Sequence, residues 1–224
     1  MIEVDTITRT YAMHGAQVRA LDGVSLHVDA GEFVAITGPS GSGKSTLLNV
    51  LGCLDKPDTG SYVLDGQEVS RLDDEAISTV RNRKIGFIFQ SFHLLPRLTV
   101  LENVLLPLRF TREPKPDVDA HARALLARVG LTDRMDHRPT ELSGGQMQRA
   151  AIARSLVLSP ALLLADEPTG NLDSKSAADV LSLIEELHAQ GQTIVLVTHD
   201  NDIAARVPRH VRLRDGKVES DAKR

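Results

Sequence analysis

A short apolar segment that runs directly into a glycine-rich loop is the feature that most constrains how this chain can fold. Residues 32–37 read Glu-Phe-Val-Ala-Ile-Thr, which predicts a strand. The loop Gly-Pro-Ser-Gly-Ser-Gly-Lys-Ser follows at residues 38–45, and a helix is expected from about Lys44 to Cys53. A strand, a Gly-x-x-x-x-Gly-Lys-Ser loop and a helix in this order form the setting of a phosphate-binding loop.

The residue types of this loop suit the phosphate chain of a nucleotide. Glycines allow successive backbone N–H groups to face phosphate oxygens, and the following helix adds the positive end of its dipole. We expect Lys44 to reach the β- and γ-phosphates, as a catalytic and a binding residue, and Ser45 to place its hydroxyl on Mg²⁺. The nucleotide-binding residues predicted in this segment are Gly38, Pro39, Ser40, Gly41, Ser42, Gly43, Lys44, Ser45 and Thr46.

A second predicted strand supplies the acidic groups that this chemistry needs. Residues 161–165 are apolar, and Asp166 and Glu167 follow directly. A carboxylate at the carboxyl end of a strand can hold Mg²⁺ directly or through water, which is the role predicted for Asp166. Glu167 is one residue further on, so it is the predicted catalytic base that polarises a water for in-line attack on the γ-phosphate.

The segment Leu-Ser-Gly-Gly-Gln at residues 142–146 has two compatible interpretations. Serine followed three residues later by glutamine is a capping-box pattern, and it predicts a helix over residues 147–158. Capping alone does not explain two glycines in the first turn, since each costs about 1 kcal/mol relative to alanine. Bare backbone N–H groups, a serine hydroxyl and a helix N-terminus together form an anion site. The residues predicted both to cap the helix and to bind nucleotide are Ser143, Gly144, Gly145 and Gln146.

Together these motifs resemble the nucleotide-binding subunit of ATP-binding cassette (ABC) transporters, over essentially the whole chain. Within that family the chain looks most like the MacB/LolD type, on residues 51–57, 85–90, 93–95 and 165–173. Polar amino-acid importers usually carry Ser-Ala or Ser-Gly where this chain has Gly170 and Asn171. Methionine at position 147 departs from the family, where glutamine is more usual, but it threatens none of the predicted roles.

The resemblance implies roles for further residues. Tyr11 looks like the aromatic residue that stacks on adenine, although a tyrosine on an edge strand is the alternative explanation. Gln90 resembles a glutamine that contacts Mg²⁺ and the attacking water, while its loop meets the membrane partner. Residues 171–173 resemble the loop that crosses to the opposite subunit, which makes Asp173 a nucleotide-binding residue. His199 resembles the switch histidine that contacts the γ-phosphate. The predicted catalytic residues are thus Glu167, His199, Gln90 and Lys44, and the predicted metal ligands are Ser45, Gln90 and Asp166.

The order of elements and the resemblance predict an α/β fold. It would be a P-loop NTPase (RecA-like) core with a small N-terminal antiparallel β subdomain and an inserted α-helical subdomain. Within a single ABC ATPase domain of residues 1–224, we assign 1–91 and 159–224 to the core and 92–158 to the helical subdomain that carries the signature motif.

Other segments are predicted from their local patterns. Residues 2–37 alternate short β-like runs with turn residues, residues 86–90 and 193–198 are expected to be strands, and residues 177–190 a helix. An apolar helix face is expected at Ala122, Leu125, Leu126 and Val129. A loop is expected at Pro114 and Pro116, and the polar segment 216–224 is expected to fray.

Composition excludes several other kinds of protein. A net charge of −4 without a basic run argues against nucleic-acid binding. Cys53 is the only cysteine, which excludes a disulfide framework and a cysteine-rich zinc site, and we expect it to be buried. The N-terminus has no signal-peptide pattern, and the longest apolar run is far shorter than the roughly 20 residues of a membrane span. We therefore expect a cytoplasmic chain that does not insert into the membrane and is peripheral on the cytoplasmic face of the inner membrane.

The resemblance implies an ATPase that drives transport. Two copies would form a homodimer that holds two ATP molecules, each between Lys44 of one copy and residues 143–146 of the other, and would dock on an integral membrane permease. Efflux, or translocation of a lipoprotein, peptide or drug, through a MacB/LolD-type permease is the predicted function. One alternative is the ATPase of an amino-acid-type importer. The other is a non-transport ABC ATPase, although the stretch between Lys44 and Ser143 is too short for the coiled-coil insertion of the chromosome-structure proteins.

Overall fold

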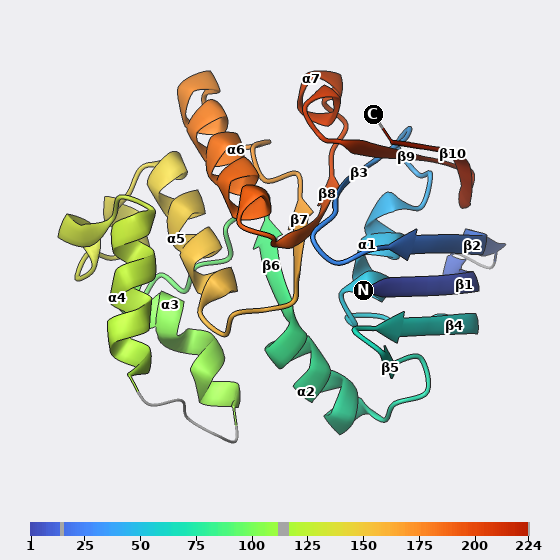
Figure 1. Cartoon of the computed structure of the whole chain (residues 1–224), viewed down its shortest axis with the longest axis horizontal. Helices are drawn as coiled ribbons and strands as arrows, with labels where there is room; N and C mark the ends of the chain where they lie inside the picture. The colour runs from blue at the N-terminus through green and yellow to red at the C-terminus, as the bar shows by residue number, and fades with distance from the viewer. Residues whose placement is uncertain (14–15, 112–116, 224) are drawn as a thin grey trace. The chain divides into compact units, whose positions relative to one another are not determined.

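The computed structural model of the chain describes residues 1–13, 16–111 and 117–223. The chain forms two compact units, which Figure 1 shows together. Unit 1 comprises Met1–Arg81 and Gly191–Arg224, and unit 2 comprises Asn82–Gln190. The loop predicted at Pro114 and Pro116 lies outside the described residues.

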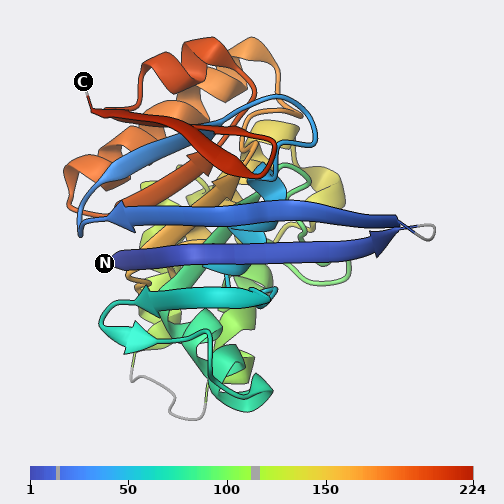
Figure 2. The ribbon, with the colours of Figure 1, turned by 90° about the vertical axis from the view of Figure 1, so that its right-hand side faces the viewer.

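An antiparallel sheet forms one layer of unit 1 (Figure 2). Its strands, in the spatial order β2-β1-β4-β5, are β1 (Ile2–Met13), β2 (Ala16–Val28), β4 (Thr59–Leu64) and β5 (Gln67–Glu68). Where the sequence shows short alternating runs, the structure has two long strands. Shifts in the register of β1 and β2, for example between Val4 and Ile7, absorb the irregular alternation and keep both of these side chains buried.

The second sheet of unit 1 carries the strand that leads into the glycine-rich loop. Its strands, in the order β10-β9-β3-β8, are β3 (Phe33–Thr37), β8 (Thr193–Val197), β9 (Arg209–Arg214) and β10 (Lys217–Lys223). Strand β3 pairs in parallel with both β8 and β9. All five residues of β8 and the first four of β3 are buried, as expected for apolar strands inside a parallel sheet. The helices α1 (Lys44–Leu51) and α7 (Asn201–Ala205) belong to this unit, and α2 (Asp74–Lys84) runs across the boundary between the units.

Unit 2 combines a parallel strand pair with helices. Strands β6 (Ile85–Phe89) and β7 (Leu162–Asp166) pair in parallel. Its helical elements are α3 (Val100–Leu105), η1 (Leu106–Phe110), α4 (Val118–Arg128), η2 (Thr132–Arg134), η3 (Pro139–Glu141), α5 (Gly144–Leu156) and α6 (Ser174–Ala189). The predicted apolar face, Ala122, Leu125, Leu126 and Val129, is buried, which confirms that prediction. The predicted helical subdomain 92–158 contains all of these helices except α6, and its boundaries stay a prediction.

Helix boundaries differ from the predicted ones where a cap residue sets them. Helix α5 begins at Gly144 instead of residue 147, because Ser143 is its N-cap. Helix α6 begins at Ser174 instead of residue 177, because the Asp173 carboxylate accepts hydrogen bonds from the first turn. Helix α1 ends at Leu51, and Cys53, with φ 54°, is buried as predicted. Burial raises the pKa of the Cys53 thiol to about 11.

The prediction that residues 216–224 fray is wrong for the described residues up to Lys223. Strand β10 pairs with β9 along its length, and the buried Arg209 on β9 anchors it. The guanidinium donates two hydrogen bonds to Asp221, at 2.9 and 2.6 Å, and one to Glu32 at 2.7 Å. Polar composition alone could not reveal this, because one partner of Arg209 lies on β10 and the other directly before β3, far apart in the sequence.

Replacing Asp221 by asparagine tests this anchor. We expect Asp221→Asn to lower the free energy of unfolding by about 1–2 kcal/mol, measured by urea denaturation at pH 7. Loss of a partner from a fully buried ion pair costs roughly 3–5 kcal/mol. The smaller value applies here because the Asp221 side chain is 35% exposed and Arg209 keeps Glu32.

The same pair predicts a pH dependence. Hydrogen bonds from Arg209 lower the pKa of Asp221, although partial burial opposes the shift. Its contribution to stability is therefore present above the pKa of an unfolded aspartate, about 3.9, and is lost as the pH falls through the lower folded pKa. The stability curves of wild type and Asp221→Asn are expected to converge in that acidic range. As the control, Asp215→Asn on the same hairpin removes a carboxylate that is 93% exposed, and we expect a loss below about 0.5 kcal/mol. Equal losses in both variants would contradict the anchor.

Candidate functional site

The glycine-rich loop between β3 and α1 is shaped by backbone that surrounds it. Gly38 and Gly43 have φ of 148° and 100°, which disfavours any residue with a side chain. A Cβ at Gly38 would lie 2.1 Å from the carbonyl oxygen of Leu213, and one at Gly43 would lie 2.3 Å from that of Ala20. Both glycines are therefore required by unit 1 itself, and the loop has a fixed shape.

Lys44 and the start of α1 make this loop suitable for an anion. The Lys44 ammonium donates to the carbonyl oxygens of Gly38 (2.8 Å) and Pro39 (2.9 Å), which carry no full charge to neutralise it. The first turn of α1 has no acidic residue and no side-chain cap, so its backbone N–H groups can meet a bound anion. Ser45 is exposed in that turn. A phosphate chain fits this combination of loop, ammonium and helix N-terminus.

His199 lies at the same edge of the sheet as this loop. Strands β3 and β8 pair up to Ile36 and Val197, and the backbone N–H of Thr198 donates to the carbonyl of Ile36 at 3.2 Å. The exposed His199 follows directly. The sequence prediction of a histidine at the carboxyl end of this strand thus agrees with the fold, and its contact with phosphate stays a prediction.

Tyr11 already has partners within unit 1. Its strand β1 lies between β2 and β4, but the pairing with β4 ends at Thr8, so Tyr11 pairs only with Val18 on β2. The Tyr11 hydroxyl donates to Asp55 at 2.6 Å, and the Arg9 guanidinium lies 4.9 Å from the centre of the ring. These contacts fix the ring, and the adenine-stacking role stays a prediction.

In unit 2 the predicted catalytic residues follow two neighbouring strands. Phe89 of β6 is in register with Asp166 of β7, and Gln90 and Glu167 directly follow the ends of these adjacent strands. Glu167 has φ 46°, a left-handed conformation that costs a non-glycine residue on the order of 1–3 kcal/mol. The turn is closed by a hydrogen bond of 3.0 Å from the Gly170 N–H to the Glu167 carbonyl. The sequence pattern gave no sign of this backbone conformation.

Two side chains of α5 that the sequence analysis did not select hold the loops around Gln90. The buried amide of Gln148 donates to the carbonyls of Phe89 (3.2 Å) and Pro168 (2.6 Å), one residue from Gln90 and from Glu167. Arg154 donates to the carbonyls of Phe92 and His93, both of which have left-handed backbone. Burial lowers the pKa of Arg154. Only their location on the helix that follows the signature segment could have suggested these residues.

The signature segment forms the predicted cap. The Ser143 hydroxyl accepts from the Gln146 N–H (3.3 Å), and the Gln146 side chain accepts from the Ser143 N–H (2.9 Å). A Cβ at Gly145 would lie 2.7 Å from the Ser176 hydroxyl on α6, so packing within unit 2 explains this glycine. A Cβ at Gly144 would meet only ordinary contacts, the nearest at 3.4 Å. Of the two glycines, only Gly144 is left without a structural reason inside the chain.

Asp173 has a structural role that the sequence analysis missed. As the N-cap of α6, it accepts hydrogen bonds from the backbone N–H groups of Lys175 (3.1 Å) and Ser176 (3.0 Å), and from the Ser176 hydroxyl (2.7 Å). Hydrogen bonds from the Ser176 backbone and hydroxyl lower the pKa of Asp173. The carboxylate is thus fixed at the start of α6, and its predicted contact with nucleotide stays a prediction.

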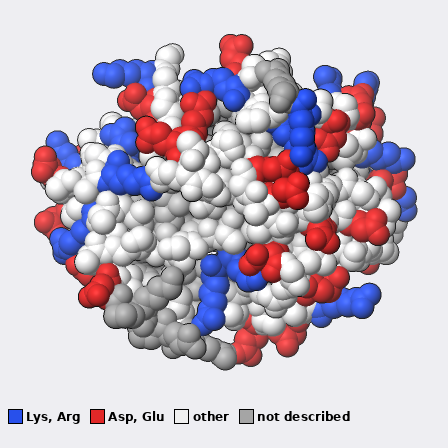
Figure 3. Space-filling view, viewed as in Figure 1, with Lys and Arg blue, Asp and Glu red and all other residues white. Residues whose placement is uncertain are grey.

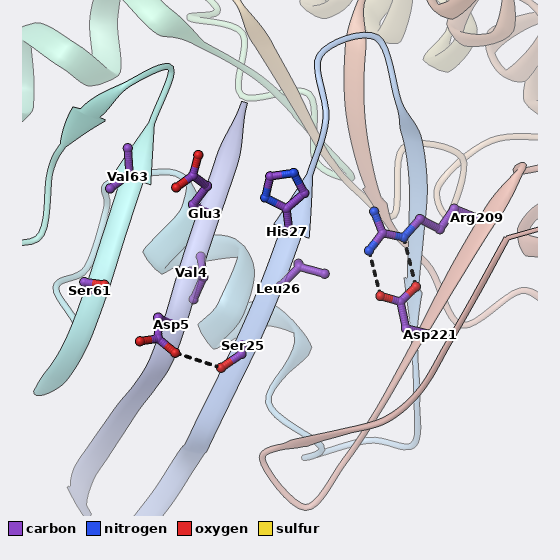
Figure 4. Close-up of a pocket in the computed structure, with 10 residues that line it drawn as sticks. All are labelled: Glu3, Val4, Asp5, Ser25, Leu26, His27, Ser61, Val63, Arg209 and Asp221. Atoms are coloured by element: carbon purple, nitrogen blue, oxygen red, sulfur yellow. Dashed lines mark hydrogen bonds and ion pairs between the residues drawn. The ribbon is translucent and has the colours of Figure 1, made fainter.

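Other surface features are separate from these residues. A hollow of about 440 Å³ in unit 1 is bounded by three strands of the antiparallel sheet and by the Arg209–Asp221 pair (Figure 4). Its lining residues are Glu3, Val4, Asp5, Ser25, Leu26, His27, Ser61, Val63, Arg209 and Asp221, and no predicted site residue is among them.

On the face shown in Figure 3, basic and acidic side chains of the described residues are interspersed. Among the described helices, none is long and apolar enough to cross a membrane.

Comparison with known proteins shows similarity along the whole chain. A sequence profile for the ABC transporter family matches residues 21–170. The macrolide export ATP-binding/permease protein MacB of Chlorobaculum tepidum is 50% identical over 224 residues, which are 100% of this chain and 34% of that protein. An uncharacterized ABC transporter ATP-binding protein of Thermotoga maritima is 50% identical over 224 residues, 100% of this chain and 96% of that protein. This chain thus spans about a third of the MacB relative and nearly all of the second protein.

Solved structures that resemble this chain also come from ABC transporters. The dimeric structure of MJ0796, a bacterial ABC transporter cassette, matches with a TM-score of 0.90 at 45% identity, over 100% of this chain and 98% of that chain. A dimeric post-hydrolysis state of the same cassette, bound to ADP and Pi, matches with a TM-score of 0.90 at 44% identity, over the same shares of both chains, 100% and 98%. This likeness confirms the predicted α/β fold class of an ABC ATPase. Since the profile covers more than half of the chain and the relatives match all of it, this chain belongs to the ABC transporter family.

Proposed function

We propose that this chain is the ATP-binding and ATP-hydrolysing subunit of an ABC transporter, and that it powers a MacB/LolD-type permease. The observation that carries the proposal is the loop of residues 38–45. Two glycines that no other residue can replace shape it, and a lysine ammonium lies against its carbonyls. Such a loop at the start of a helix binds the phosphates of a nucleotide. The chain belongs to the ABC transporter family, and a similar cassette was solved with ADP and Pi bound; both facts support ATP as the nucleotide.

Each predicted site residue has a role in this proposal. Residues 38–46 hold the phosphates, with Lys44 on the β- and γ-phosphates, and Tyr11 stacks on the adenine. His199 donates to the γ-phosphate. Ser45, Gln90 and Asp166 supply a hydroxyl, an amide and a carboxylate oxygen, which are the ligand types that Mg²⁺ prefers. When bound, Mg²⁺ would neutralise negative charge on the phosphate oxygens.

Glu167 is the proposed general base. It takes a proton from the water that attacks the γ-phosphate, and its position directly after β7 fixes the carboxylate near the end of the strand. The strained left-handed backbone at this residue is common at functional sites, where the surrounding structure holds a side chain in one direction. Gln90, at the end of the neighbouring strand, orients the same water.

Two copies of the chain complete the proposed enzyme. Residues 143–146 and Asp173 of one copy contact the nucleotide held by the loop of the other. A serine hydroxyl and a helix N-terminus with an unobstructed Gly144 suit a γ-phosphate that approaches from outside the chain. The dimeric cassettes that resemble this chain support this assembly. The dimer docks on the cytoplasmic face of an integral membrane permease.

Export or extraction is the proposed direction of transport. MacB, which is 50% identical to this chain, is a macrolide export protein that contains both an ATP-binding and a permease part. Gly170 and Asn171 also favour this type over the amino-acid importers, which usually carry Ser-Ala or Ser-Gly there. Co-purification with a four-helix permease that has a large extracytoplasmic domain would support the proposal, and co-purification with a solute-binding protein would favour the importer.

Replacing the proposed base separates binding from hydrolysis. We expect Glu167→Gln to lower ATP turnover by about 10²–10⁴-fold, because the amide cannot accept a proton from water. ATP binding remains, so the variant accumulates as an ATP-bound dimer, measured by light scattering after size-exclusion chromatography. The control is Glu186→Gln, which makes the same change at an exposed position of α6 and leaves turnover unchanged. Near-normal hydrolysis by Glu167→Gln would refute the assignment of the base.

Blocking the signature segment tests the two-chain site. We expect Ser143→Arg to lower turnover by at least about 100-fold, because a bulky cation replaces the hydroxyl that contacts the γ-phosphate. ATP binding by the monomer, measured by fluorescent-nucleotide titration, is spared, since the loop of residues 38–46 is intact.

A second capping box in unit 2 provides the matched control. Thr99 caps α3: its hydroxyl accepts a hydrogen bond from the Glu102 N–H (3.2 Å), and its own N–H donates to the Glu102 carboxylate (2.7 Å). Thr99→Arg and Ser143→Arg each lose a cap, which costs about 1 kcal/mol of stability. If both variants lose turnover equally, the signature segment is only a helix cap and the two-chain site is wrong.

A further inference from the structure

Two amide side chains on different loops of unit 2 bind one another. The Asn171 side chain donates from Nδ2 to the backbone carbonyl of Gln90 at 3.0 Å. The Gln90 side chain donates from Nε2 to the Oδ1 atom of Asn171 at 3.2 Å. The contact therefore closes a ring that joins the end of β6 to the loop before α6.

One atom in this ring fixes the orientation of both amides. A backbone carbonyl oxygen is only an acceptor, so Asn171 must turn its Nδ2 toward the Gln90 carbonyl. Its Oδ1 then faces the Gln90 side chain, where only the Nε2 group of Gln90 can donate a hydrogen bond to it. A flipped Gln90 would place two oxygens against each other. The Oε1 of Gln90 is consequently turned away from Asn171.

Gly170 provides the space for this arrangement. A Cβ at this position would lie 2.6 Å from Nε2 and 3.0 Å from Cδ of Gln90, so the amide lies directly against the glycine. Gly170 has no positive φ, and no turn geometry requires it to be glycine. The close approach of the Gln90 side chain therefore explains why position 170 is a glycine.

The backbone that presents Gln90 is itself fixed. Gln148 holds the carbonyl of Phe89 before it, and Arg154 holds the carbonyl of Phe92 after it. With the main chain held on both sides, rotation of the side-chain amide is the main freedom left to Gln90. The hydrogen bonds with Asn171 restrict that rotation.

We propose that Asn171 is a positioning residue that, with the space left by Gly170, orients the Gln90 amide so that its Oε1 is presented to Mg²⁺. Only the oxygen of a glutamine amide can ligate a cation, so a randomly flipped amide offers the right atom half of the time. This inference rests on the proposed function, which makes Gln90 a metal ligand. It also gives a physical meaning to the residue pair that separates this chain from amino-acid importers.

The test compares three variants of the full chain. Asn171→Leu keeps a similar size and removes both hydrogen bonds, and Gly170→Ala displaces the amide while Asn171 is intact. Asp179→Leu is the control, because it places the same apolar side chain at an exposed position of α6. The first readout is the side-chain amide signal of Gln90 in ¹⁵N–¹H spectra of the nucleotide-free protein, assigned by its absence in Gln90→Ala. We expect it to move to the position of a free glutamine in Asn171→Leu and Gly170→Ala only.

The second readout is the Mg²⁺ concentration that gives half-maximal ATP hydrolysis. We expect an increase of about tenfold in Asn171→Leu and Gly170→Ala, the low end for residues that orient a metal ligand, and no change in the control. In a Gln90→Ala background, Asn171→Leu is expected to cause no further increase.

The outcomes distinguish this inference from the function beneath it. An unchanged Gln90 signal, or an unchanged Mg²⁺ requirement in an active Asn171→Leu variant, overturns the positioning role and leaves the ATPase proposal intact. A wild-type chain that does not hydrolyse ATP overturns both. A general loss of stability would lower the maximal rate without a shift in the Mg²⁺ requirement, and that result also counts against the inference.

Discussion

The close approach of helix α5 to strand β6 is the contact on which the predicted chemistry of unit 2 depends. A Cβ at Gly86 would lie 2.5 Å from the carbonyl oxygen of Ser155, so only glycine permits this distance. Because the helix lies so near, Gln148 and Arg154 can reach backbone carbonyls on both sides of Gln90. The same helix begins with the signature segment. Helix α5 thus begins at the segment proposed to bind the partner's nucleotide and also carries Gln148 and Arg154, which hold the backbone around the proposed metal ligand Gln90. A movement of this helix would therefore be felt at both places.

In unit 1 the corresponding constraint is the backbone around the glycine-rich loop. The carbonyls of Ala20 and Leu213 come from segments far apart in the sequence, and both lie where a side chain at Gly43 or Gly38 would have to be. The loop therefore depends on the tertiary packing of β2 and β9 as well as on its own composition. A chain with the same loop sequence and a different surrounding sheet would not be held to this shape, which is why a motif alone is weaker than a motif in its fold.

The sequence predicted the strands β3, β6, β7 and β8 and the helices α1, α4, α5 and α6, because apolar runs, helical periodicity and motifs are local in the sequence; the fold class followed from their order and from the family resemblance. The capping box of residues 143–146 was predicted, although the helix itself was placed from residue 147, whereas the Asp173 cap of α6 and the pairing of residues 217–223 through Arg209 were not predicted. The Asp173 cap bonds residues of its own helix turn and was overlooked, but the pairing of residues 217–223 depends on a buried Arg209 whose partners are decided by three-dimensional packing. Gln148 was missed for the same reason, since a buried glutamine on a helix has no periodic signature. The left-handed backbone at Glu167 is likewise set by the turn around it, and residue type gives no indication of it.

The signature segment shows how structure refines a motif. From sequence, both glycines indicated close approach by a ligand, but Ser176 of α6 already occupies the space beside Gly145. The argument for an external phosphate therefore depends on Gly144 and on the Ser143 hydroxyl. A related distinction applies to Gly170, whose neighbour is the Gln90 side chain of its own unit. A glycine in a nucleotide-binding motif thus indicates a close approach, and only the three-dimensional structure shows whether the approaching group is the ligand or the chain itself.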